Sequence, residues 1–233
     1  MEAERALEES VRGRVALPLG RTAAMAERTR FMDHEVADAL GRNVDQLVLL
    51  GAGYDGRSLR FGGGPARWFE VDLPETLADK RRRLEALGVT PANVRFLGLD
   101  LARDDVGAAL ASAGHDGTRP TLFVAEGLFD DLTLETVAAL CADLRSRAAA
   151  GSVLAATFRV SPERGTRGQA VRESFDQLRR AVGQERPSEF LPGDAQKLFV
   201  VTGWRVIRTS SSPPGWLGQG SSLVALAGEP VTR

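Results

Sequence analysis

Short, largely apolar runs alternate with helix-like stretches over the first two thirds of the chain. The runs at 47–50, 67–71, 94–99, 121–125 and 153–158 have the length of strands, and the first is apolar without alternation, as in strands buried on both faces. Between them, apolar positions spaced three to five residues apart predict helices over 21–40, 55–60, 74–87, 104–113 and 134–149. This alternation predicts an α/β fold with a doubly wound, mostly parallel sheet.

The pattern changes after residue 158. Helices are expected over 169–182 and 194–202, and two further strands over 204–209 and 222–227, separated by a loop rich in Ser and Pro. These last strands predict an antiparallel edge hairpin, which would bring the sheet to seven strands. At the other end, Pro18 and Gly20 interrupt the first twenty residues, where no long helix is expected.

The glycines after the first strand indicate a nucleotide-type cofactor. Gly51 and Gly53 let the backbone approach a ligand where a Cβ atom would collide, and the following helix would present free N–H groups. The second strand ends in Asp72, which is placed to hydrogen-bond a ribose diol. With Gly56, the glycines also match the G-x-G-x-x-G fingerprint of dinucleotide sites, so this pattern alone leaves the cofactor open.

Three features favour S-adenosylmethionine over NAD. The third and fourth strands also end in acids, Asp100 and Glu126, and several acids would repel a pyrophosphate but not a sulfonium cofactor. The single tyrosine, Tyr54, lies inside the glycine turn, which excludes a dehydrogenase with a Tyr-x-x-x-Lys pair. One sheet domain also uses nearly the whole chain and leaves no second catalytic domain.

Three blocks carry a resemblance to a known family: LLGAGYDGR at 49–57, FEVDLPE at 69–75 and AEGL at 125–128. Together they resemble the leucine carboxyl methyltransferase family, whose bacterial branch includes polyketide carboxyl O-methyltransferases. The resemblance implies a class I, Rossmann-like methyltransferase fold and one domain over 1–233. Its expected parts are an N-terminal helical cap at 1–43, a cofactor-binding core at 44–158, and substrate-side helices with C-terminal edge strands at 159–233.

The resemblance also implies how S-adenosyl-L-methionine is held. Arg30 would meet the methionyl carboxylate, while Gly51 and Gly53 would pack against the aminoacyl part. Asp72 would hold the ribose. Carboxylates suit hydroxyl and ammonium groups, and a guanidinium suits a carboxylate, so these roles agree with the chemistry of the side chains.

The remaining implied contacts come from the third and fourth strand ends. Asp100 and Leu101 would read the adenine, and Glu126 would contact the methionyl amino group. The chain departs from the family at Asp131 and Leu59, where aromatic residues are usual. A cofactor-binding protein without methyl transfer therefore stays open as an alternative, and an NAD-dependent oxidoreductase is the less favoured third hypothesis.

The main hypothesis is an S-adenosylmethionine-dependent O-methyltransferase that acts on a small, polyketide-like metabolite. A carboxylate acceptor is already ionised at neutral pH and needs no general base, whereas a hydroxyl acceptor would benefit from one. His34, on the helix beside Arg30, is either a candidate base that faces the site or a surface or satisfied helix residue, and His115 is interpreted as a solvated loop residue. Asp55 and Arg57 are interpreted as a pair that braces the turn. No catalytic residue is assigned.

The composition limits the classes of binding partner. The 30 Lys and Arg residues against 31 Asp and Glu residues leave a net charge of −1, which offers no basic field for nucleic acid or membranes. No apolar run is long enough to span a bilayer. The single cysteine, Cys141, has the helical spacing of a buried residue and suits a reducing cytoplasm, and two distant histidines make a metal site improbable. The expected partner is a small-molecule acceptor; the oligomeric state is not predicted.

Overall fold

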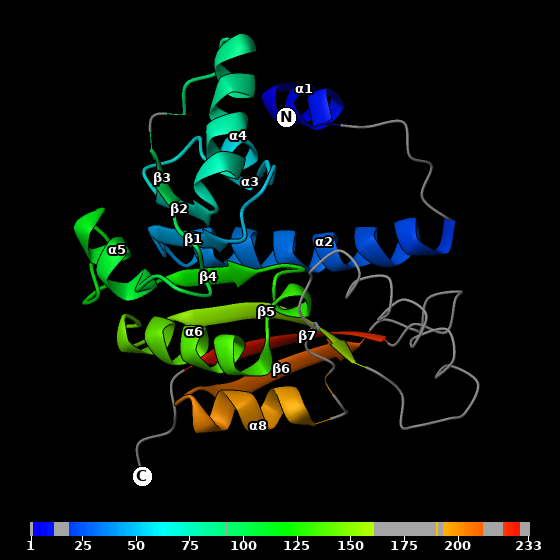
Figure 1. Cartoon of the computed structure of the whole chain (residues 1–233), viewed down its shortest axis with the longest axis vertical. Helices are drawn as coiled ribbons and strands as arrows, with labels where there is room; N and C mark the ends of the chain where they lie inside the picture. Colours follow the sequence, from blue (N-terminus) through cyan, green and yellow to red (C-terminus); the bar gives the residue numbers. More distant parts are fainter. Residues whose placement is uncertain are drawn as a thin grey trace.

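The five strands predicted from the first part of the chain form the parallel part of one sheet, in the order β3-β2-β1-β4-β5 (Figure 1). The computed structural model describes residues 2–11, 19–91, 93–160, 190, 193–211 and 221–228. The five parallel strands are β1 (Gln46–Leu50), β2 (Arg67–Asp72), β3 (Val94–Gly98), β4 (Leu122–Ala125) and β5 (Val153–Val160). The mostly parallel α/β sheet is therefore confirmed.

Two later strands extend the sheet beyond β5. They are β6 (Arg205–Ser211) and β7 (Ser221–Gly228). β7 pairs antiparallel with β5 on one side and with β6 on the other, so the full order is β3-β2-β1-β4-β5-β7-β6. The last strand in sequence thus lies inside the sheet, and β6 lies at its edge.

The helices follow most of the predicted segments. They are α1 (Glu2–Val11), α2 (Leu19–Gly41), α3 (Arg57–Arg60), α4 (Pro74–Ala86), α5 (Val106–Ser112), α6 (Leu134–Ser146) and α8 (Asp194–Val201), with a 3₁₀ turn η1 (Phe129–Asp131). The helix expected over 169–182 lies outside the described residues. Within the part of the chain that is described, no helix combines the length and apolar character needed to cross a membrane.

Before α2 begins, the described residues contain no long helix, and the short helix α1 occupies Glu2–Val11. Pro18 and Gly20 lie beyond its end, so their effect on the backbone does not reach it. A ten-residue helix is marginal alone and needs tertiary contacts. Leu7 is fully buried, and Glu4 pairs with Arg60 of α3 at 2.8 Å, so docking onto the domain stabilises α1.

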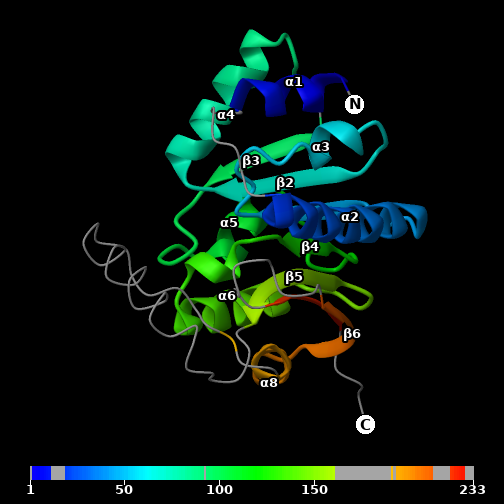
Figure 2. The same ribbon diagram turned by 90° about the vertical axis from the view of Figure 1, so that its right-hand side faces the viewer.

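Apolar side chains fill the space on both faces of the sheet. On one face, Leu47 and Leu49 of β1 pack in a cluster with Met32 and Val36 of α2. The opposite face carries a second cluster, to which β1, α5 and α6 contribute Val48, Leu50, Leu110 and Leu144. Figure 2 shows α2 on one side of the sheet and α5 and α6 on the other. Because both faces are covered, β1 is apolar at every position after Gln46.

The strand order predicts a ligand site at the carboxyl ends of the parallel strands. From β1 the chain proceeds to β2 and β3 on one side, then crosses back to β4 on the other side of β1. In such sheets, ligands bind outside the carboxyl ends of the strands, where the order of the strands reverses. The segments that follow β1, β2, β3 and β4 therefore meet at the carboxyl ends of these strands.

Candidate cofactor site

Asp72 joins the glycine turn after β1 to the beginning of α4. Its Oδ2 atom accepts a hydrogen bond from the Gly53 N–H at 2.7 Å, and its Oδ1 atom accepts one from the Leu73 N–H at 2.7 Å. The carboxylate stays partly exposed. Each carboxylate oxygen can accept more than one hydrogen bond, so Asp72 retains capacity for hydroxyl groups of a ligand.

The glycine turn depends on left-handed backbone conformations. Gly51 has a φ of 62° and Gly53 a φ of 43°, in the region that side chains disfavour. A Cβ atom on Gly51 would lie 3.0 Å from Cδ1 of Leu128, which belongs to the segment after β4. The turn after β1 and the segment after β4 therefore approach each other closely at Gly51.

Glu126 follows β4 directly and is surrounded by cationic and hydroxyl donors. Its Oε1 atom accepts hydrogen bonds from Arg28 Nε at 2.9 Å and Thr29 Oγ1 at 3.0 Å, and its Oε2 atom accepts one from Arg57 Nη2 at 2.6 Å. Burial would raise the pKa of Glu126, but Arg57 and Arg28 together hold that pKa below its ordinary value. Glu126 is therefore an anion at neutral pH.

Arg57, at the start of α3, connects three carboxylates. Its guanidinium pairs with Asp33 at 2.8 Å, Asp55 at 2.5 Å and Glu126 at 2.6 Å, and its side chain is only 4% exposed. Burial would lower the pKa of Arg57, but these carboxylates raise it above its ordinary value. The bracing pair of Asp55 and Arg57 is confirmed, and Arg57 extends it to α2 and to the end of β4.

The structure brings Arg28, rather than Arg30, to this cluster. Arg30 is exposed, and its Nε atom donates to the carbonyl of Ala26 in the same helix at 3.1 Å. Arg28 lies one helical turn before the buried Met32, so it projects from the packed side of α2. The methionyl-carboxylate role predicted for Arg30 remains a prediction, and Arg28 is the arginine that contacts Glu126.

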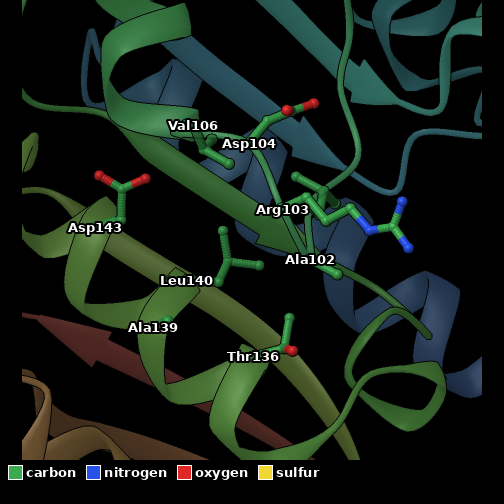
Figure 3. Close-up of a pocket in the computed structure, with 9 residues that line it drawn as sticks. Ala102, Arg103, Asp104, Val106, Thr136, Ala139, Leu140 and Asp143 are labelled. Carbon is green, nitrogen blue, oxygen red and sulfur yellow. The ribbon is translucent and has the colours of Figure 1, made fainter. Parts of the chain in front are cut away.

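A shallow hollow of about 200 Å³ lies beside the end of β3. It is bounded by the segment 101–106 and by α6, with Leu101, Val106, Thr136 and Leu140 among its lining residues (Figure 3). The Asp100 carboxylate precedes it and accepts a hydrogen bond from the Ala102 N–H at 3.0 Å. Sites that enclose a drug-sized ligand measure roughly 300–1,000 Å³, so this hollow can hold only part of a ligand.

The two histidines lie in different surroundings, and only His34 is at the surface. His34 is exposed on α2. His115 is only 3% exposed, so the interpretation as a solvated residue is wrong. Its ring lies near Phe69 and Phe123, and its Nε2 atom hydrogen-bonds Thr121 Oγ1 at 2.9 Å, just before β4 begins. His115 therefore lies at the amino end of β4, away from the glycine turn.

Two further side chains that the sequence singled out have raised pKa values. The Cys141 thiol is buried in α6, as predicted, and burial raises its pKa to about 12. The hydroxyl of Tyr54 donates to Asp79 Oδ2 at 2.5 Å, and this hydrogen bond raises the pKa of Tyr54. The raised pKa values favour the protonated form of both groups at neutral pH.

Solved structures define the class of fold. A "putative methyltransferase" from Thermobifida fusca superimposes with a TM-score of 0.68 at 16% sequence identity, over 99% of this chain and 90% of that one. The magnesium protoporphyrin IX methyltransferase of Synechocystis PCC 6803, with bound SAH, gives a TM-score of 0.61 at 16% identity, over 98% of this chain and 94% of that one. The protein thus has the α/β fold of methyltransferases.

Sequence comparison identifies the family. The family model for leucine carboxyl methyltransferase matches residues 3–145, which is more than half of the chain. The chain belongs to the leucine carboxyl methyltransferase family. A relative from Mycolicibacterium smegmatis, named "putative S-adenosyl-L-methionine-dependent methyltransferase", is 40% identical over 157 residues, which cover 65% of this chain and 51% of that protein. The chain spans about half the length of the curated relatives it matches.

Proposed function

We propose that this protein is an S-adenosyl-L-methionine-dependent O-methyltransferase. The observation that carries the proposal is the placement of Asp72, Asp100 and Glu126 at or just after the carboxyl ends of parallel strands, around the turn of Gly51 and Gly53. The family membership and the names of the relatives support it. The acceptor in this proposal is the carboxylate, or a hydroxyl, of a small polyketide-like metabolite.

The residues present fit this cofactor chemically. A ribose diol, an adenine amino group and an ammonium group are hydrogen-bond donors, and the strand ends offer carboxylates to accept from them. Asp72 would bind the ribose, Glu126 the ammonium group, and Asp100 with Leu101 the adenine beside the hollow. Arg28 is better placed than Arg30 to bind the methionyl carboxylate, because it already lies against Glu126.

In this reaction the residues of the site orient the cofactor and the acceptor. The bound cofactor supplies a methyl group on a sulfonium for in-line displacement. A carboxylate acceptor is ionised at neutral pH, so the residues of the site need only hold the two reactants in line. Such positioning can lower the activation barrier by about 7–11 kcal/mol. The burial of His115 away from the glycine turn supports such an acceptor, since this histidine is not available as a base at the site.

The region predicted to cover the substrate includes residues 161–189, which lie outside the described residues. The balanced charge of the chain supports a small-molecule acceptor over nucleic acid. The site thus supports the cofactor and the reaction type. The carboxylate acceptor is supported by its own ionisation at neutral pH, which makes a general base unnecessary.

Calorimetric titration tests the cofactor. The wild-type protein is expected to bind S-adenosylmethionine and its demethylated product, and the Asp72→Ala variant to bind both at least about tenfold more weakly. NADH is the control ligand. Binding of NADH alone, or of none of the three, would contradict the proposal.

Turnover separates the proposed enzyme from a protein that only binds the cofactor. Asp131, which replaces an aromatic residue of the family, is exposed, and this departure is the observation that favours the alternative. Transfer of an isotopically labelled methyl group to a panel of aryl and alkyl carboxylic acids, and to the matching alcohols, distinguishes the two. Cofactor binding without transfer to any acceptor would support the binding protein.

A further inference from the structure

A lysine and a glutamate are completely buried beneath the glycine turn. Lys80 of α4 and Glu70 of β2 are both 0% exposed, and Lys80 Nζ lies 2.5 Å from Glu70 Oε2. Taking two charges out of water costs several kcal/mol for each ion, and a well-packed apolar pair of similar volume is often as stable or more stable. The pair is therefore poorly explained as a device for packing alone.

The pair has a third partner, which lies in the turn itself. Lys80 Nζ also donates to the backbone carbonyl of Asp55 at 2.7 Å. Glu70 Oε1 accepts a hydrogen bond from Ser58 Oγ at 2.5 Å, so β2, the turn and α3 are all tied to α4. No apolar side chain could hold the Asp55 carbonyl in this way.

The contacts continue from Asp55 to the site. The Asp55 side chain accepts from the Arg57 backbone N–H at 2.8 Å and pairs with the Arg57 guanidinium at 2.5 Å. Arg57 in turn pairs with Glu126 at 2.6 Å. One connected set of polar contacts thus leads from Lys80, through the backbone between Gly53 and Arg57, to the carboxylate that follows β4.

We propose that Lys80 and Glu70 are positioning residues that fix the glycine turn, and through Arg57 the Glu126 carboxylate, in the arrangement that binds the cofactor. This inference rests on the proposed function. Neither residue needs to touch the cofactor. Their effect is to remove the alternative backbone conformations that the glycines of the turn would otherwise permit, so that less ordering is required when the ligand binds.

The test compares a charge-free double variant with single variants. Lys80→Met alone leaves the Glu70 carboxylate buried without its cation and is expected to be strongly destabilised. Glu70→Gln combined with Lys80→Met removes both charges, keeps an acceptor for Ser58, and removes the hydrogen bond to the Asp55 carbonyl. Its melting temperature should lie closer to wild type than that of Lys80→Met. Its dissociation constant for S-adenosylhomocysteine should nevertheless rise about tenfold.

A matched control separates positioning from general loss of stability. Leu144→Ala removes a buried side chain of α6 from the core on the opposite face of the sheet and should lower the melting temperature without changing the affinity. Equal weakening of affinity by Leu144→Ala, or affinity of the double variant within about twofold of wild type, would overturn the inference. Failure of the wild-type protein to bind would overturn the proposed function itself, and the inference with it.

A milder variant covers the case in which the double variant does not fold. Ser58→Ala retains both charges and removes only the hydrogen bond to Glu70. Because it loosens the same attachment between α3 and the buried pair, affinity should fall about threefold, at the lower end of the range for one hydrogen bond. Unchanged affinity in Ser58→Ala would also count against positioning by the pair.

Discussion

Arg57 and Glu126, 69 positions apart in the sequence, are joined by an ion pair of 2.6 Å. The first follows the glycine turn after β1, and the second follows β4, on the other side of the point where the strand order reverses. The pair therefore holds together the two halves of the proposed site. Because Arg57 also binds Asp33 of α2, the same guanidinium fixes the helix that carries Arg28.

Removal of the Arg57 charge should destabilise the protein strongly. Arg57→Met leaves three partly buried carboxylates without their shared cation and is expected to lower the free energy of unfolding by about 3–5 kcal/mol. Arg57→Lys should recover only part of this loss, because an ammonium group lacks the planar fork that reaches several carboxylates at once. Urea denaturation measures both. Arg42→Met, which breaks an exposed pair with Asp38, is the control and should change stability by less than about 1 kcal/mol.

Arg28 and Arg30 make a matched pair for cofactor affinity. Arg28→Met should weaken binding of S-adenosylhomocysteine about tenfold, because a charge-assisted contact near Glu126 is lost. Arg30→Met should leave affinity within about twofold, since the Arg30 side chain is exposed and bonded to its own helix. Calorimetry of both variants decides between them. The reverse order of effects would show that the role implied by the family resemblance falls on Arg30.

Gly51→Ala tests the close approach at the turn. A Cβ atom at a φ of 62° is strained and would meet Leu128 at 3.0 Å, so the unfolding free energy should fall by about 1–3 kcal/mol. Combining it with Leu128→Ala should relieve the contact but leave the backbone strain, so the loss of stability that Gly51→Ala causes should be only partly removed. Gly63→Ala, where a Cβ atom would meet nothing within 4 Å, serves as the neutral reference. Equal stability of Gly51→Ala and Gly63→Ala would contradict the structure of the turn.

His115 should make stability depend on pH. Burial, reinforced by Arg147 and Arg67, lowers the pKa of His115 to about 4 from an ordinary value of 6.5. Between these values the unfolded chain binds the proton and the folded protein does not, so the stability present above pH 6.5 is lost as the pH falls towards 4. The loss amounts to at most roughly 3 kcal/mol. The neutral variant His115→Gln should lack this slope in chemical denaturation between pH 7 and 4, and an unchanged slope would contradict the assignment.

The elements of the fold were predictable because their signals are local. The apolar run of β1 ends at Leu50, immediately before the glycine turn, and β2 ends in Asp72, so the boundaries of both strands are visible in the sequence. The acids at the strand ends were equally visible. Their convergence follows from the parallel order of the strands, which the alternation of strands and helices already implied.

Other features depend on contacts that the sequence does not display. His115 stands in a Gly- and Asp-rich loop, and only the fold places its ring near Phe69 and Phe123. In the sequence, Lys80 has the features of a surface residue on a highly charged helix. Only the structure shows its contacts with Glu70 and Asp55. Arg28 was accessible in principle, because it lies four residues before Met32 and eight before Val36, on the apolar stripe of α2.

The position of β7 has a consequence for synthesis of the chain. β7 is the last described strand in sequence, yet it lies between β5 and β6 and contributes the hydrogen bonds that attach β6 to the sheet. When translation has reached residue 211, β6 exists as a segment without its neighbour, and β5 presents an unpaired edge. The sheet is completed only when the segment through Gly228 has left the ribosome and inserted between them. Exposure of β5 before β7 has formed therefore presents an open edge suited to pairing with other chains, which makes β5 and β6 the stretch where a chaperone has the most to protect.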